Sequence, residues 1–115
     1  MRLADVAADR RGIQRRDQQD QRFLTLLAAL RRHGGMLPDD DVRRISFVSR
    51  PNFALGEALI RGDVYALNWR HQRWIPMFQF HMPGLRINAT ASEVVAELSP
   101  RLQGFELTEW FTSIH

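Results

Sequence analysis

The sequence contains no cysteine and no lysine, and it has no long apolar run. Without cysteine the chain forms no disulfide and offers no thiolate ligand to a metal. A membrane helix needs about 18 or more consecutive apolar residues, and the sequence has no such run. Charged residues interrupt the first apolar stretch, which excludes a signal peptide. At 115 residues, we expect one domain that acts in the cytoplasm, without a membrane, metal or cofactor.

The missing lysine makes arginine the only permanent side-chain cation, and the arginines are unevenly distributed. Residues 1–50 hold eleven Arg against seven Asp, a net charge of +4, whereas residues 51–115 hold five Arg against six acids, a net charge of −1. A basic half of this kind can meet phosphates or an acidic partner. The alternative is a compositional bias toward arginine without a binding role.

The most aromatic stretch is residues 65–80, YALNWRHQRWIPMFQF. Residues 64–69 and 74–80 are rich in β-branched and aromatic side chains, and a polar run of four residues, 70–73, separates them. This pattern predicts a β-hairpin. Both faces of 74–80 are apolar. Because Pro76 cannot donate a ladder hydrogen bond, we expect an edge strand or a strand that leaves the sheet there.

Helices are expected on both sides of the hairpin. Residues 19–33 carry an apolar stripe at helical spacing and end at two glycines. Shorter helices at 38–46 and 53–61, with a turn between them, have the proportions of a helix-turn-helix, although such helix pairs are common. We interpret 1–18, which has few large apolar residues, as a flexible Arg-rich arm, either frayed or forming a helix that orders only against a partner.

The C-terminal third predicts a short extended segment at 85–87 and helices that together cover 93–111. The whole pattern predicts an α+β fold, a mainly helical small domain with one β-hairpin at 65–80 packed on helices. In this interpretation the chain has two parts, the arm 1–18 and a single helical domain with the hairpin at 19–115.

The arginines nearest the predicted helix-turn-helix are the first candidates for DNA contacts. Arg50 and Asn52 fall at the start of the second helix, where base-edge or phosphate contacts are made, and Arg61 falls at its end. A mobile basic arm can add phosphate contacts. A solvated arm is the alternative. The arm candidates are Arg10, Arg11, Arg15 and Arg16.

No motif for catalysis stands out. The serines lack a nucleophile-elbow context, and no glycine-rich phosphate loop is present. Residues 39–41 are consecutive aspartates, which a helix spreads around its axis, so we interpret them as a solvated helix start. The histidines also lack ligand spacing. The sequence therefore predicts a protein that is not an enzyme. The four histidines are His33, His71, His81 and His115.

Several stretches between residues 34 and 111 form a further pattern. They are Gly34-Gly35, the helix pair around Ser49-Arg50, ALIRGDVYAL at 58–67, WIPMFQF at 74–80, Ala96-Glu97-Leu98, and Trp110-Phe111.

Together these stretches resemble antitoxins of the Xre/MbcA/ParS group. The resemblance implies a degenerate helix-turn-helix that leads into a small hairpin, and a function in binding DNA, a partner toxin protein, or both. It also implies a partner-binding surface in the C-terminal part of the chain, for which we expect Trp110 and Phe111 to be the anchors.

Two readings of function follow. The first is an antitoxin-like small binding protein for DNA, a toxin protein or both. The alternative is a homodimeric structural or interaction protein without a nucleic-acid role. We expect a homodimer because both faces of 74–80 are apolar, and a chain this small has limited means to cover both.

Overall fold

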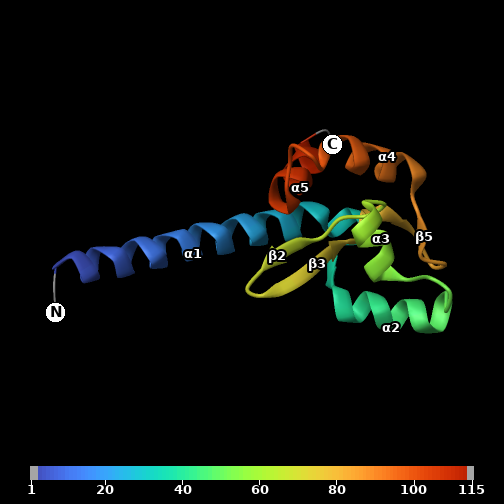
Figure 1. Ribbon diagram of the computed structural model, residues 1–115, viewed down its shortest axis with the longest axis horizontal. Helices are drawn as coiled ribbons and strands as arrows, with labels where there is room; N and C mark the ends of the chain where they lie inside the picture. Colours follow the sequence, from blue (N-terminus) through green and yellow to red (C-terminus); the bar gives the residue numbers. More distant parts are fainter. Residues whose placement is uncertain (1–2, 114–115) are drawn as a thin grey trace.

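A three-stranded antiparallel sheet lies at the centre of the computed structural model, with α1 on one face and the helix pair α2–α3 on the other (Figure 1). The structure describes residues 3–113, and the side chains of residues 15–113. The predicted fold class is confirmed: the domain is mainly helical and carries a small antiparallel sheet. The prediction of a separate flexible arm stays a prediction.

Helix α1 runs from Leu3 to Leu30 and is followed by a 3-10 turn at Arg31–His33. The helix expected at 19–33 therefore begins much earlier, and its backbone continues through 3–18. This segment extends beyond the rest of the domain (Figure 1). The side chains of Arg10 and Arg11, which were predicted to touch DNA, lie outside the described side chains.

The central sheet contains β1 (Met36–Pro38), β2 (Leu67–Trp69) and β3 (Gln72–Pro76), in the order β1-β3-β2. The predicted hairpin is β2–β3, but its turn is shorter than expected. Only Arg70 and His71 connect the strands, and both have positive φ, 51° and 59°. Two consecutive left-handed residues match the twist of a tight hairpin. The prediction missed β1 because it is only three residues long.

Pro76 ends β3, as one of the two expectations for this proline required. The other expectation, an edge strand, is wrong because β3 is the central strand. Pro76 is paired with Met36 at the last position of the ladder, where a missing donor is tolerated. The chain continues through a 3-10 turn, Met77–Gln79, into β4 (Phe80–His81), which pairs with β5 (Arg86–Ile87).

The helix pair consists of α2 (Asp39–Ser49) and α3 (Leu55–Arg61). The apolar inner stripe of this pair packs against the sheet and forms one core with it. This core includes the fully buried Val42 and Ile75. On the opposite face of the sheet, α1 forms a second core through Phe23, Leu26 and Leu30.

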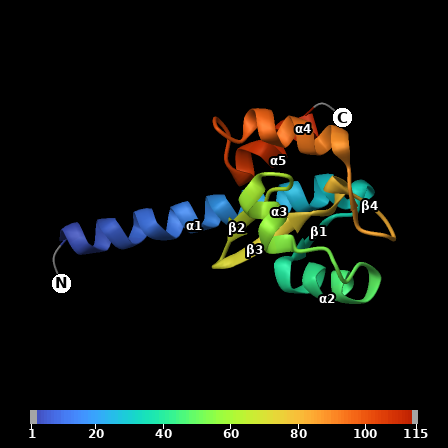
Figure 2. The same ribbon diagram turned by 45° about the vertical axis from the view of Figure 1, so that its right-hand side comes forward.

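Helices α4 (Ala89–Leu98) and α5 (Gly104–Ser113) lie across the sheet region from α2 (Figures 1 and 2). The side chain of Asn88 caps α4 by accepting a hydrogen bond from the amide of Ala91 at 3.2 Å. Gly104 lets α5 approach β2, because a Cβ there would lie 2.7 Å from the Cα of Leu67.

The apolar faces of the hairpin are covered by helices of the same chain. Trp69 and Trp74 pack under α1, with Phe23 stacked on Trp69 at 3.9 Å between ring centroids, whereas Ile75 packs under the helix pair. The reason for expecting a homodimer, that a small chain cannot cover both faces, is therefore wrong. The homodimer itself stays a prediction.

The glutamine of the FQF run has a structural role. The side chain of Gln79 is buried; it donates to the carbonyl oxygens of Tyr65 at 2.9 Å and Pro76 at 3.0 Å, and accepts from the amide of Tyr65 at 2.8 Å. The hydroxyl groups of Tyr65 and Thr108 are hydrogen-bonded at 2.8 Å. This network ties the hairpin to α5 and satisfies backbone groups that burial would otherwise leave unpaired.

Among the described residues, no helix combines the length and apolar character that a membrane span requires.

Candidate nucleic-acid interface and partner surface

The turn between α2 and α3 brings Arg50 and Asn52 together at the surface. Arg50 is held within the molecule, since its guanidinium donates to the carbonyl oxygen of Leu85 at 3.1 Å and lies over the ring of Phe53 at 5.3 Å. Asn52 is exposed. Arg61, the third predicted contact on the helix pair, lies at the other end of α3.

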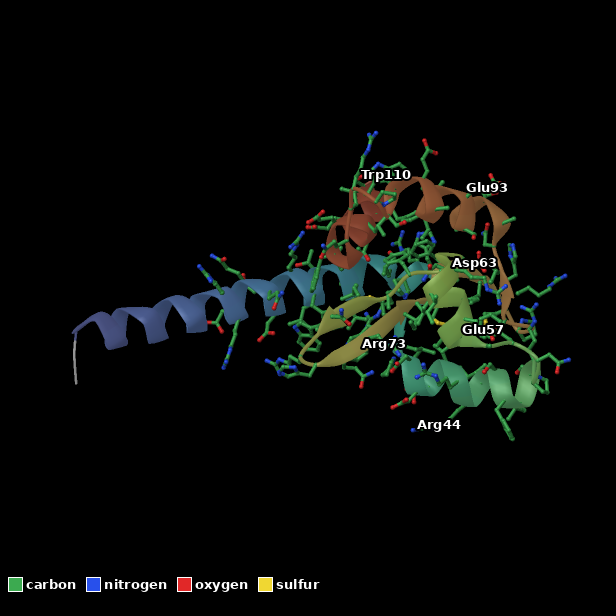
Figure 3. All side chains as sticks on the ribbon, in the orientation of Figure 1. Arg44, Glu57, Asp63, Arg73, Glu93 and Trp110 are labelled. Carbon is green, nitrogen blue, oxygen red and sulfur yellow. The ribbon has the colours of Figure 1, made fainter. Side chains whose placement is uncertain are left out.

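The arginines on the helix pair are paired with nearby acids. Arg61 contacts Glu57 at 2.7 Å, and Arg44 contacts Asp41 at 3.2 Å. Both are pairs at helical spacing on the surface, and Figure 3 shows Arg44 on the outer side of α2. These acids reduce the positive charge that the helix pair presents to a phosphate.

Asp39 corrects the prediction that residues 39–41 form a solvated helix start. Its side chain is buried and accepts hydrogen bonds from Arg43 at 3.0 Å, Gln72 at 2.8 Å and Arg73 at 3.1 Å. Burial opposes ionisation, but these hydrogen bonds outweigh it and hold the pKa of Asp39 below its ordinary value. Asp39 therefore joins the start of α2 to β3; Arg73 is labelled between them in Figure 3.

Both helices of the pair also expose large apolar side chains. Phe47 and Val48 are 80% and 81% exposed, and Ile60 on α3 is 88% exposed. A helix that reads base edges presents polar side chains there. The helix pair is therefore poorly suited to sequence-specific contacts, although it can still lie against a nucleic-acid backbone or a protein.

Arg15 and Arg16, on α1, differ from the helix-pair arginines. Both are exposed, and among the described side chains neither forms an ion pair. The hairpin turn with Arg70 and His71 lies close to this part of α1 (Figures 1 and 2). We call Arg15, Arg16, Arg70 and His71 the tip surface.

A clamp around Asp20 fixes the hairpin turn against α1. The carboxylate accepts hydrogen bonds from the indole nitrogen of Trp69 at 2.8 Å and from Arg70 at 2.6 Å, and Arg70 also lies over the Trp69 ring at 4.8 Å. The hydrogen bond from Arg70 lowers the pKa of Asp20, so the carboxyl group of Asp20 is ionised at neutral pH.

The clamp borders a hollow that faces solvent. Its walls come from α1 and from the hairpin turn, and they carry hydrogen-bond donors from arginine, histidine, asparagine and glutamine side chains. Donors of this kind suit phosphate oxygens. The lining residues are Arg16, Gln19, Asp20, Asn68, Trp69, Arg70 and His71.

The residues predicted to touch DNA do not form one surface. Arg50, Asn52 and Arg61 belong to the helix pair, on one face of the sheet, whereas Arg15 and Arg16 belong to α1, on the other. Sequence reasoning missed Arg70 and His71 as site residues. The signal was present in the polar run RHQR, which was interpreted only as a connection between strands.

The predicted partner anchors lie together on α5, on the opposite side of the molecule from Arg44 (Figure 3). Phe111 is buried and packs against Phe78 at 4.6 Å between ring centroids. Trp110 is half-buried and meets Phe111 edge-on at 5.2 Å. Phe111 therefore belongs to the core, while Trp110 keeps a part of its surface available.

Comparisons of this chain with protein-family models, curated proteins and solved structures found no match.

Proposed function

We propose that this protein is an antitoxin-like binding protein of the cytoplasm that contacts DNA and a partner toxin protein, without catalysis. The DNA contacts are made with the phosphate backbone, chiefly by the tip surface. Arg10 and Arg11 extend these contacts along α1, and the partner is bound through the C-terminal helices. The family resemblance supports the class of protein. The geometry supports the assignment of DNA contacts to the tip surface and of partner binding to the C-terminal helices.

One observation carries the DNA half of this proposal. Arg16 on α1 and Arg70-His71 on the hairpin turn are far apart in sequence, but they line one solvent-facing hollow beside the Asp20 clamp, and Arg15 precedes Arg16 on the same helix. Arg15 and Arg16 form no ion pair among the described side chains and keep their charge for phosphates, whereas the ion pair with Asp20 offsets part of the charge of Arg70. Backbone contacts of this kind supply affinity and little sequence information.

The helix pair has a supporting role in this proposal. Asn52 is exposed in the turn between α2 and α3 beside Arg50, and Arg61 lies at the far end of α3, so these residues add weak contacts apart from the main surface. Because Arg50 and Arg61 are engaged within the chain, each must exchange a partner before it contacts DNA. The helix pair therefore contributes less affinity than the tip surface.

A salt titration with a fluorescently labelled random-sequence duplex tests the DNA half. Fluorescence anisotropy should show binding at low salt, with log K falling linearly as log salt rises, by about 0.9 for each phosphate contact. Binding that does not depend on salt, or no binding at low salt, would overturn it.

The exposed apolar side chains Phe47, Val48 and Ile60 favour a second candidate, an interaction protein without a nucleic-acid role. Phe47 and Val48 are adjacent and both exposed, and contiguous exposed apolar surface marks protein contacts. In that case Phe47→Ser should abolish a protein association and leave any DNA binding unchanged. Sedimentation velocity of the wild type and this variant at micromolar concentration separates the homodimer from a monomer.

A further inference from the structure

A groove runs between the last turns of α1 and helix α5. Its walls include the exposed alanines Ala28 and Ala29 on α1, and Phe78 and Phe111 form aromatic surface beside them. Alanines leave room above the aromatic surface, so an inserted side chain can reach it. The groove is distinct from the tip surface, and none of its lining residues was predicted to bind DNA.

The apolar surface of the groove continues along α1. Leu24 is 56% exposed and precedes Ala28 by four residues, so both lie on the same face of the helix. Between α1 and α5, Arg22 forms an ion pair with Glu109. The strip thus extends over about two turns of helix, which matches the apolar face of a short helical segment.

The rim of the groove at the end of α1 is positively charged. Arg32 and His33 line it, and Arg31 precedes them in the same 3-10 turn. Neither Arg31 nor Arg32 forms an ion pair with any described side chain. The groove therefore combines an apolar floor with Arg31 and Arg32, neither of which is paired with an acid among the described side chains.

From this combination we infer that the groove binds an acidic amphipathic helix of a partner protein. One apolar side chain of the helix lies over Phe78 and Phe111, and a carboxylate near its end faces Arg32. This inference rests on the partner-binding half of the proposed function, and it adds the location of the site and the chemistry of its occupant.

Charge complementarity selects this occupant over a second copy of the chain. The most exposed apolar side chains of this protein, Phe47, Val48 and Ile60, lie one helical turn or less from arginines on the same helices. A second copy that offered them would bring the ion pairs Arg44–Asp41 and Arg61–Glu57, whose carboxylates are already engaged, toward Arg31 and Arg32. A nucleic acid fits the rim but leaves the apolar floor uncovered.

Selection from a displayed library of random helical peptides on the full-length protein tests the inference. Enriched peptides should combine large apolar side chains at helical spacing with Asp or Glu. An enriched peptide, resynthesised with a fluorophore, should lose about tenfold in affinity toward Ala28→Trp, which fills the groove, and toward Arg32→Glu, which reverses the rim charge.

Arg101→Glu, an equal charge reversal on the exposed α4–α5 connection, is the matched control and should bind the peptide like the wild type. Because Ala28 and Arg32 are exposed, circular dichroism melts should show both variants folded. Ala28→Trp should also keep the duplex-DNA affinity of the wild type, so failure of the DNA proposal and failure of the groove are separate results.

Three outcomes would overturn the inference. The first is a selection that enriches no peptide, or enriches basic ones. The second is an enriched peptide that binds Ala28→Trp as tightly as the wild type. The third is a wild-type dimer in sedimentation that Ala28→Trp converts to a monomer, since this result would assign the groove to a second copy.

Discussion

Helix α1 and the helix pair α2–α3 both carry exposed arginines, but they use them differently. On the helix pair, acids at helical spacing contact the arginines, as in the pairs Arg44–Asp41 and Arg61–Glu57. On α1, Arg15 and Arg16 have no such contact among the described side chains. The helix that resembles a DNA reader therefore presents less available charge than the helix behind the sheet.

The charge that a helix can offer to phosphates is therefore the charge that remains after its ion pairs within the chain are subtracted. The acids at the start of α2 favour that helix through its positive end, and the same acids bind arginines one turn later. Asp20, the corresponding acid on α1, is directed toward the hairpin turn, and Arg15 and Arg16 form no ion pair with any side chain that the structure describes. Net charge by segment predicted a basic half, and the pairing decides which part of it can meet phosphates.

The largest expected effect is a loss of stability on removing the carboxylate of Asp39, the acid of the helix pair with the most hydrogen-bond partners. Asp39→Ala leaves three donors without their acceptor and should lower the free energy of unfolding by about 2–3 kcal/mol. Asp40→Ala is the matched control, because Asp40 is exposed and its contact with Arg43 is 3.6 Å long. That change should cost less than about 0.5 kcal/mol in urea denaturation.

Equal losses for Asp39→Ala and Asp40→Ala would contradict the structural role given to Asp39.

Acid should weaken the same contact. The pKa of Asp39 in the folded protein lies below its ordinary value of 3.8, so its ionised form stabilises the fold above that pH. This contribution is lost as the pH falls below about 4 and through the folded pKa. Urea denaturation at several pH values should show the wild type and Asp39→Asn converging in stability at low pH. A constant difference would show that ionisation of Asp39 does not matter.

Deleting residues 1–18 should lower the affinity for a random-sequence duplex by about tenfold at low salt and flatten its salt dependence, because it removes Arg15 and Arg16 with the rest of the predicted arm. Fluorescence anisotropy measures the change. The core residue Phe23 is retained, and a thermal melt should confirm that the shortened chain folds. An unchanged salt slope would remove the arm from the DNA interface.

The smallest expected effect is a gain in DNA affinity when an arginine of the helix pair is released from its acid. Glu57→Gln releases Arg61 from its ion pair and should raise the duplex affinity by about twofold, because an exposed pair contributes little and the freed cation can reach a phosphate. Titration of both proteins at the same low salt concentration measures this. A fall in affinity would mean that Arg61 is not hindered by Glu57.

Much of the fold follows from patterns that the sequence carries locally. The apolar stripe of α1, the proline that ends β3 and the aromatic hairpin were all predicted, because each depends on spacing within a few residues. Strand β1 was not, because three residues carry no periodicity and its place is set by pairing with β3. Which helix covers each face of the sheet is likewise decided by long-range packing.

The candidate site was predicted less well than the fold, for a related reason. Arg15 and Arg16 could be named from sequence, but the proximity of Arg16 to Arg70 and His71 depends on the Asp20 clamp, whose members are about 50 residues apart. The same holds for Asp39, whose partners Gln72 and Arg73 come from a distant strand. Side-chain pairing across the fold therefore corrected the interpretation of Asp39 and added Arg70 and His71 to the candidate site.

The most direct test of the central claim compares two double variants that remove the same charge from the two helices. Arg15→Gln/Arg16→Gln and Arg43→Gln/Arg44→Gln should both fold, and duplex binding is measured against salt for each. We expect the α1 variant to lower the salt slope by about 1.8, that is, two phosphate contacts, and the α2 variant to lower it by less than about 0.9. Equal slopes, or a larger loss for the α2 variant, would contradict the claim that α1 and the tip surface supply the phosphate contacts.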